Sequence, residues 1–242
     1  MAAAFGWGTL AGSSLVIGAL IALRIQIGLR AIGLIMGFGA GVLISAVAFD
    51  LVEEAAEMSG QGAVIGGIFA GCAVFFVGDW LIDRYGGSER KDATGGQESG
   101  SALAIVLGTV LDGVPESMVI GLTIFEGGAV GAAFLAAVFI SNLPESISAT
   151  SGLVSSGWKK ARILWMWSAM ALVSGLASLA RIGLFQDSSP DTVAFVLAFA
   201  AGAILTMLAD TMMPEAFEHG ARLVGVVTTL GFVIAFTIHA LE

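Results

Sequence analysis

Long runs of apolar residues, separated mostly by short polar stretches, set the pattern of this chain. A helix needs about 20 apolar residues to cross the hydrocarbon core of a bilayer. On that criterion the pattern predicts eight membrane-spanning helices. They are expected near 4–23, 31–56, 62–83, 101–125, 129–155, 162–182, 191–216 and 222–241. The sequence therefore predicts an all-α integral membrane protein in which residues 1–242 form a single transmembrane domain.

The composition supports this class. Hydrophobic residues make up 57% of the chain, only 12% of residues are charged, and the mean hydropathy is +0.95. A soluble domain carries roughly twice as much charge. The single cysteine, Cys72, excludes an internal disulfide and a Cys-rich metal cage. The ten Lys and Arg residues form no basic face for phosphates, so we expect the lipid bilayer as a partner and no nucleic acid. The sequence leaves open whether two copies pair as a homodimer.

The positive charges predict how the chain is oriented. The one long polar stretch between predicted spans, at about 84–100, is rich in Gly, Ser and charge, which is typical of a flexible loop. With eight spans, only Arg181 falls on the opposite side from this loop. The nine residues on the side of the loop are Arg24, Arg30, Arg84, Arg90, Lys91, Lys159, Lys160, Arg162 and Arg222. Loops rich in Lys and Arg stay in the cytoplasm. We therefore expect a multi-pass protein of the cell membrane with both termini outside and a cytoplasmic loop at 84–100.

Two pairs of predicted spans resemble each other. LDGVPES at 111–117 matches ISNLPES at 140–146, and GVLISAVAFDLVEEA at 41–55 aligns without gaps to GAILTMLADTMMPEA at 202–216. The members of each pair run in opposite directions under the eight-span topology. This pattern predicts a 3+2+3 bundle, in which the last three spans are inverted relative to the first three. Inverted repeats whose broken helices meet near the bilayer midplane are typical of secondary transporters.

The fourth and fifth predicted spans carry acidic residues where apolar ones are expected. A carboxylate near the bilayer centre costs at least about 2.5–3.5 kcal/mol and usually marks an ion or proton path. Pro115 and Pro144 lack an N–H, so each leaves a backbone carbonyl one turn earlier without its usual donor. The side chains expected to converge with these carbonyls on a divalent cation are Asp112, Glu116, Ser141, Asn142 and Glu145. Such an oxygen-rich set suits a divalent metal ion. The alternative is that these groups only bridge helices by hydrogen bonding.

Further acids lie near the ends of the second and seventh predicted spans. Asp50, Glu53, Glu54 and Glu57 form one helical stripe at the outer end of the second span. Asp210, Glu215 and His219 lie toward the inner end of the seventh span. We expect Asp50, Glu53, Glu54, Asp210, Glu215 and His219 to line the routes by which an ion enters or leaves. Solvation of helix ends explains these polar residues equally well. His239 is interpreted as an interfacial histidine.

These motifs resemble those of the ZIP family of divalent metal-ion transporters, and the resemblance covers nearly the whole chain. The family's fourth span carries H-N-x-P-E-G, which here reads DGVPES at 112–117, and its fifth carries x-x-x-P-E-G, here SNLPES at 141–146. The family's second span often ends H-L-x-P-E-A, here DLVEEA at 50–55. Its seventh span often ends P-E-A, here residues 214–216. The resemblance implies eight spans in a three–two–three inverted arrangement and transport of a metal ion.

The resemblance places the family's binuclear metal centre on Asp112, Glu116, Ser141 and Glu145, with Asn142 shared by a second metal position. The chain departs from the family where Asp112 replaces the motif histidine and where serines replace both motif glycines. The predicted sixth span also lacks the acid that some members use. The family implies Zn²⁺, Fe²⁺ or Mn²⁺ as the transported ion. An added carboxylate in place of an imidazole favours Mn²⁺ over Zn²⁺.

The leading interpretation is a transporter that imports Zn²⁺, Mn²⁺ or Fe²⁺ into the cytoplasm through a site between the fourth and fifth spans, with no tightly bound cofactor. Two alternatives stay open. One is a non-transporting metal sensor of the same fold, and the other is a proton-coupled secondary carrier of another family. An enzyme is not expected, because the chain contains neither an HExxH motif nor a GxGD protease motif.

Overall fold

The computed structural model describes residues 2–84, 107–108, 110–113, 116–117, 132–185 and 188–241. The regular structure within these ranges is helical, as the sequence predicts. Most of the predicted fourth span at 101–125, including Pro115, and all but Arg84 of the predicted loop at 84–100 lie outside the described residues.

The helices follow the predicted spans closely. The elements are α1 Ala2–Arg24, α2 Leu29–Ala46, η1 Val47–Glu53, α3 Glu54–Met58, α4 Gln61–Ile82, α6 Ala132–Ser155, α7 Lys160–Phe185, α8 Pro190–Met207, η3 Leu208–Met212, α9 Met213–Gly220 and α10 Leu223–His239. Here η denotes a π-helical turn, and α2–η1–α3 and α8–η3–α9 are each continuous. Within the described residues, five of these segments are long and apolar enough to cross a membrane: Phe5–Arg24, Leu29–Met58, Gln61–Ile82, Lys160–Leu179 and Pro190–Gly220.

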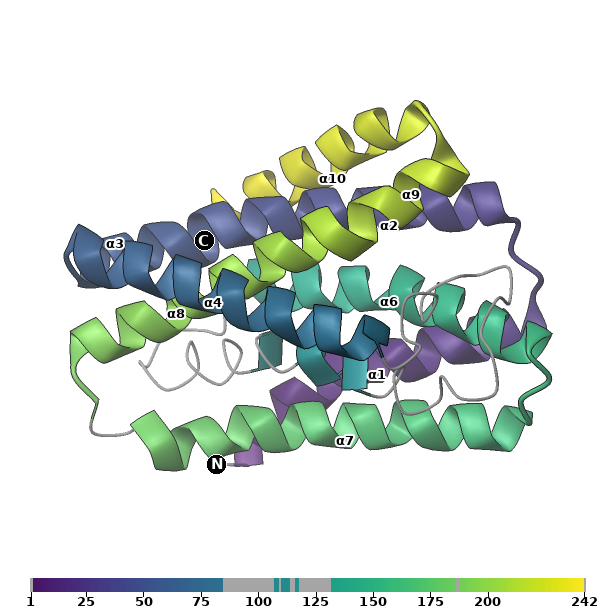
Figure 1. Ribbon diagram of the computed structural model, residues 1–242, viewed down its shortest axis with the longest axis horizontal. Helices are drawn as coiled ribbons and strands as arrows, with labels where there is room; N and C mark the ends of the chain where they lie inside the picture. The colour runs from purple at the N-terminus through teal and green to yellow at the C-terminus, as the bar shows by residue number, and fades with distance from the viewer. Residues whose placement is uncertain are drawn as a thin grey trace.

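The helices lie side by side along the long axis of the molecule (Figure 1). The segments α1, α6 and α8–η3–α9 end where α2, α7 and α10 begin, at one end of the bundle, and α4 runs toward the same end (Figure 1). The basic residues in or next to these termini are Arg24, Arg30, Arg84, Lys159, Lys160, Arg162 and Arg222. The described part of the chain thus gathers these seven positive charges at one end.

Two helices change to π-helical geometry at the same position of the aligned repeat. The alignment of 41–55 with 202–216 pairs Val47 with Leu208, and these residues begin η1 and η3. It also pairs Leu51 with Met212, and both side chains are buried within their π-turns. A π-turn inserts an extra residue into a helix and often occurs at functional sites. The repeat found in the sequence therefore extends to a shared local distortion.

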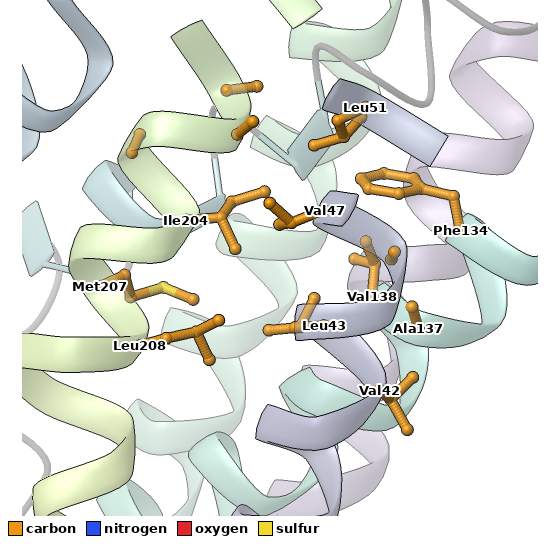
Figure 2. Packing of buried hydrophobic residues seen from close by; sticks show 14 of the residues in the cluster. Val42, Leu43, Val47, Leu51, Phe134, Ala137, Val138, Ile204, Met207 and Leu208 are labelled. Carbon is orange, nitrogen blue, oxygen red and sulfur yellow. The ribbon is translucent and has the colours of Figure 1, made fainter. Parts of the chain in front are cut away.

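Buried side chains of α2 and η1 pack between α8–η3 and α6 (Figure 2). Val47 points toward Ile204, and Leu43 points toward Leu208 (Figure 2). The alignment of the repeat pairs Val47 with Leu208 and Leu43 with Ile204. Replacing each residue by its aligned partner therefore turns one of these contacts into the other. On the other side of α2, the core is completed by Phe134, Ala137 and Val138 of α6 (Figure 2).

Glycines bring the outer helices close to this centre. A Cβ at Gly41 of α2 would overlap the carbonyl oxygen of Thr228 in α10, and one at Gly202 of α8 would overlap that of Ile68 in α4. Gly41 and Gly202 are aligned in the repeat. Small residues of this kind let membrane helices approach backbone to backbone. The α2–α10 and α4–α8 pairs are thus built in the same way.

A second group of helices, α1, α6 and α7, packs around Trp167 of α7. The buried cluster consists of Leu15, Ala19, Ala149, Leu153, Ile163, Trp167 and Met170. The indole Nε1–H of Trp167 donates to Thr150 Oγ1 of α6 at 2.9 Å, and both side chains are fully buried. A satisfied hydrogen bond of this kind fixes how α7 is rotated against α6. That rotation decides which residues of α7 face the pocket that is described in the next subsection.

Candidate functional site

A pocket lies between α1, α6, α7 and the described helical residues of the predicted fourth span. Its cavity volume is about 20 Å³, which is room for about one water-sized ligand. The residues that line it and carry carboxyl or amide groups are Asp112, Glu116, Asn142 and Glu145. Four of the five side chains proposed from sequence as metal ligands therefore border one pocket.

The acidic residues of the pocket are shielded from solvent. Asp112 is 4% exposed and Glu116 is 2% exposed, while Glu145 is half-buried. Among the described residues that line the pocket, the three carboxylic acids are the only ionisable side chains. A carboxylate buried away from water is high in energy unless its charge is compensated. The three acids therefore make this pocket the candidate site of the described residues.

Ser141, the fifth predicted ligand, faces elsewhere. Its hydroxyl donates to the carbonyl oxygen of Val138 in its own helix at 3.0 Å. A Cβ at Gly39 of α2 would come within 3.2 Å of the Cα of Ser141, so this part of α6 packs against α2. Ser141 is buried, but it does not line the pocket. The i,i+4 spacing of Ser141 and Glu145 alone does not account for how tightly α2 packs on this face of α6.

The P-E-S motif at 144–146 is held by a hydrogen bond within α6 and by packing against α1. Pro144 lies inside the helix and has no N–H, so it gives no hydrogen bond to the carbonyl oxygen of Ile140. Ser146 donates from its hydroxyl to the carbonyl oxygen of Leu143 at 3.0 Å. A Cβ at Gly18 of α1 would overlap this hydroxyl. Glycine at position 18 thus lets α1 pack directly against the motif.

The predicted outer residues do not reach the pocket. Asp50 lies in η1, and its Oδ1 is 2.7 Å from Nδ1 of His239 at the end of α10. The His239 ring stacks on Phe49 with 5.5 Å between ring centres. His239, interpreted from sequence as an interfacial histidine, is therefore also a partner of Asp50. Glu53 is exposed and Glu54 is half-buried.

The predicted inner residues spread over η3 and α9. Asp210 is exposed, and Glu215 and His219 are half-buried. The Oε1 atom of Glu215 accepts a hydrogen bond from the hydroxyl of Ser148 at 2.6 Å. Ser148 is fully buried in α6 and follows Glu145 by about one helical turn. The bond therefore links α9 to the helix that carries a pocket carboxylate.

The contribution of α7 to the pocket was not predicted from the sequence. The pocket is also lined by four residues of this helix: Met170, Val173, Ser174 and Ala177. The i,i+4 spacing of Met170 and Ser174 is visible in the sequence, but charge and proline directed attention to other helices. Ser178, on the same face of α7, donates from its hydroxyl to the carbonyl oxygen of Ser117 at 2.8 Å.

Over the described residues, no group of three or more His, Cys, Asp and Glu side chains is arranged to hold a metal ion.

No protein-family model matches the chain. A protein of Arabidopsis thaliana named "Putative zinc transporter" is 26% identical to it over 191 residues. The match covers 78% of this chain but only 30% of the length of that relative. This match agrees with the resemblance between the motifs at 112–117 and 141–146 and those of ZIP transporters. Together with the apolar helices, it identifies the chain as a multi-pass helical membrane protein.

Proposed function

We propose that this protein carries a divalent metal ion across the membrane, and that the pocket lined by Asp112, Glu116, Asn142 and Glu145 holds the ion on its way. The observation behind this proposal is that two repeated acidic motifs border the same pocket, although Glu116 and Glu145 are 29 positions apart in the chain. The Arabidopsis relative, named a zinc transporter, supports a metal ion as the transported substrate.

The chemistry of the pocket favours a cation with more than one charge. Three carboxyl groups and one amide supply hard oxygen ligands, which suit divalent metal ions. A divalent ion compensates two carboxylates at once and removes the repulsion between them. The pocket lies beside Pro144, where the helix lacks one backbone hydrogen bond, and unwound or broken helices form the ion sites of many secondary transporters. The substrate class is Zn²⁺, Mn²⁺ or Fe²⁺.

We propose import into the cytoplasm, in a bundle of eight spans arranged 3+2+3. The aligned π-turns of η1 and η3 and the exchanged contacts of Val47 and Leu43 support an inverted repeat. The seven basic residues at one end of the described bundle support a cytoplasmic location for that end. In this orientation both termini lie on the outer side of the cell membrane, and the loop at 84–100 lies in the cytoplasm.

Glu116→Gln and Glu145→Gln test the pocket directly. Each removes one carboxylate and keeps the size of the side chain, so we expect both variants to lose calorimetric binding of Zn²⁺ and Mn²⁺ by the purified protein. Glu218→Gln is a matched control, because Glu218 is exposed on α9 and lies outside the pocket. Wild-type affinity in both pocket variants would place the metal site elsewhere.

Uptake into proteoliposomes separates the proposed carrier from its two alternatives. A carrier moves the metal ion into the vesicle, whereas a sensor binds it without uptake. A proton-coupled carrier of another substrate acidifies or alkalises the vesicle without accumulating metal. Loss of metal uptake in Glu116→Gln and Glu145→Gln, with uptake kept in Glu218→Gln, is the result expected of the proposal.

A further inference from the structure

The face of α7 that borders the pocket carries a sulfur atom to which no role has been assigned. Trp167, Met170, Ser174 and Ser178 follow i, i+3, i+7, i+11 spacing, so they form one stripe along the helix. Met170 is 7% exposed and lines the pocket together with Asp112, Glu116 and Glu145. Among the described lining residues, Met170 is the one with a sulfur-containing side chain.

Two hydrogen bonds hold this stripe in position. Trp167, about one turn before Met170, donates to Thr150 of α6 at 2.9 Å. Ser178, about two turns after Met170, donates to the carbonyl oxygen of Ser117 at 2.8 Å. The backbone of α7 is therefore fixed against both helical segments that supply the pocket carboxylates. The methionine side chain itself has three rotatable bonds and can adjust to a bound ion.

We propose that the thioether sulfur of Met170 binds the metal ion in the pocket and thereby selects for thiophilic divalent cations. This inference rests on the proposed function, and it adds a ligand from α7 to the carboxylates of the two repeated motifs. Thioether sulfur is a soft ligand that contributes little to binding of hard cations such as Mg²⁺, Ca²⁺ or Mn²⁺. It adds affinity for softer ions such as Cd²⁺, which serves as the probe here, and to a lesser degree for Zn²⁺. Under this proposal Met170 favours soft ions such as Cd²⁺ and Zn²⁺, whereas Asp112 favours hard ions such as Mn²⁺.

Cd²⁺ and Mn²⁺ titrations of the purified full-length protein test this role. All variants carry Cys72→Ser, so that the single thiol of the chain, on α4, cannot bind Cd²⁺. Met170→Leu keeps the apolar volume and removes the sulfur. We expect it to weaken Cd²⁺ binding about tenfold while Mn²⁺ binding changes less than about twofold. Met207→Leu is the matched control, because Met207 is 3% exposed in α8 and lies outside the pocket.

X-ray absorption at the cadmium edge detects a sulfur ligand directly, without a comparison of affinities. The Cd²⁺-loaded Cys72→Ser protein should show a sulfur scatterer at bonding distance, which Met170→Leu removes and Met207→Leu keeps. A spectrum with oxygen and nitrogen scatterers alone, or an unchanged ratio of Cd²⁺ to Mn²⁺ affinity in Met170→Leu, overturns the inference. If binding depends on Glu116 and Glu145 but not on Met170, only this inference fails. If binding is independent of both glutamates, the proposed function fails as well.

Discussion

Asp112 stands where ZIP transporters carry the histidine of their fourth-span motif. It is almost fully buried and borders the pocket beside Glu116. An aspartate offers only oxygen, whereas an imidazole offers a borderline nitrogen that suits Zn²⁺. The substitution at this position therefore shifts the ligand set toward harder ions, under the proposal that the pocket binds metal.

Asp112→His should raise the affinity for Zn²⁺ relative to Mn²⁺ by about tenfold, because a nitrogen ligand replaces an oxygen ligand and one negative charge is removed. Calorimetric titration of both ions on the wild type and the variant measures this ratio. Asp210→His is a control, because Asp210 is exposed on η3 outside the pocket. An unchanged ratio in Asp112→His would remove Asp112 from the set of metal ligands.

Ser146 replaces the second motif glycine of the family, and Gly18 of α1 makes room for its hydroxyl. Gly18→Ala should therefore lower the free energy of unfolding by about 1–3 kcal/mol, as overpacking of a dense core does. The added Cβ also meets the carbonyl oxygen of Leu143 at 2.7 Å, so Ser146→Gly in the same chain should recover only part of the loss.

Thermal unfolding in detergent of the wild type, both single variants and the double variant completes this cycle. Gly6→Ala is the control substitution on α1, because a Cβ there meets no atom within 4 Å. Equal losses in Gly18→Ala with and without Ser146→Gly would show that the hydroxyl of Ser146 does not set the distance between α1 and α6.

At the scale of the elements, the bond between Ser148 and Glu215 joins α6 to α9. Ser148→Ala should lower the free energy of unfolding by about 1–2 kcal/mol, because a buried hydrogen bond to a carboxylate is lost. Ser151→Ala is a close control, since the Ser151 hydroxyl donates at 2.8 Å to Ile147 within its own helix. Thermal unfolding of both variants measures the difference, and equal effects would mean that the link to α9 adds nothing.

The helices themselves were largely predictable, because apolar length and the polar residues between runs mark where a helix leaves the membrane. The predicted spans 31–56 and 191–216 fall within the continuous helical segments Leu29–Met58 and Pro190–Gly220. The π-turns were not predictable, because Val47 and Leu208 are ordinary apolar residues whose backbone geometry depends on tertiary packing. The repeat alignment nevertheless singled out the two segments in which they occur.

The candidate site was predictable in part, and for a physical reason. Buried acids are costly, so Asp112, Glu116 and Glu145 stand out against an apolar background. Ser141, also predicted as a ligand, does not line the pocket, because its orientation depends on the packing of α2. Met170 and the pairing of His239 with Asp50 depend on contacts between helices distant in sequence, which one-helix spacing rules do not capture.

At the scale of the whole molecule, the distribution of positive charge and the direction of the helices predict one orientation. Seven of the eight described Lys and Arg residues lie in or next to helix termini on the side of the bundle where α2, α7 and α10 begin (Figure 1). The eighth, Arg181, lies near the other end of α7. The opposite end carries the α3–α4 turn, where Ser59 donates to Asp191 Oδ1 at 2.6 Å. Lys and Arg near the ends of membrane helices are retained on the cytoplasmic side.

Single cysteines in a Cys72→Ser background should report this orientation in intact cells. A cysteine at Ser155, exposed at the end of α6, or at Ser99 in the predicted loop should resist a membrane-impermeant thiol reagent until the cells are opened. A cysteine at Gly60, exposed between α3 and α4, should react at once, because that turn lies at the other end of the bundle. The reverse pattern would invert the topology and, with it, the proposed direction of transport. Labelling at all three positions would instead show that the protein inserts in both orientations, which the clustering of basic residues at one end argues against.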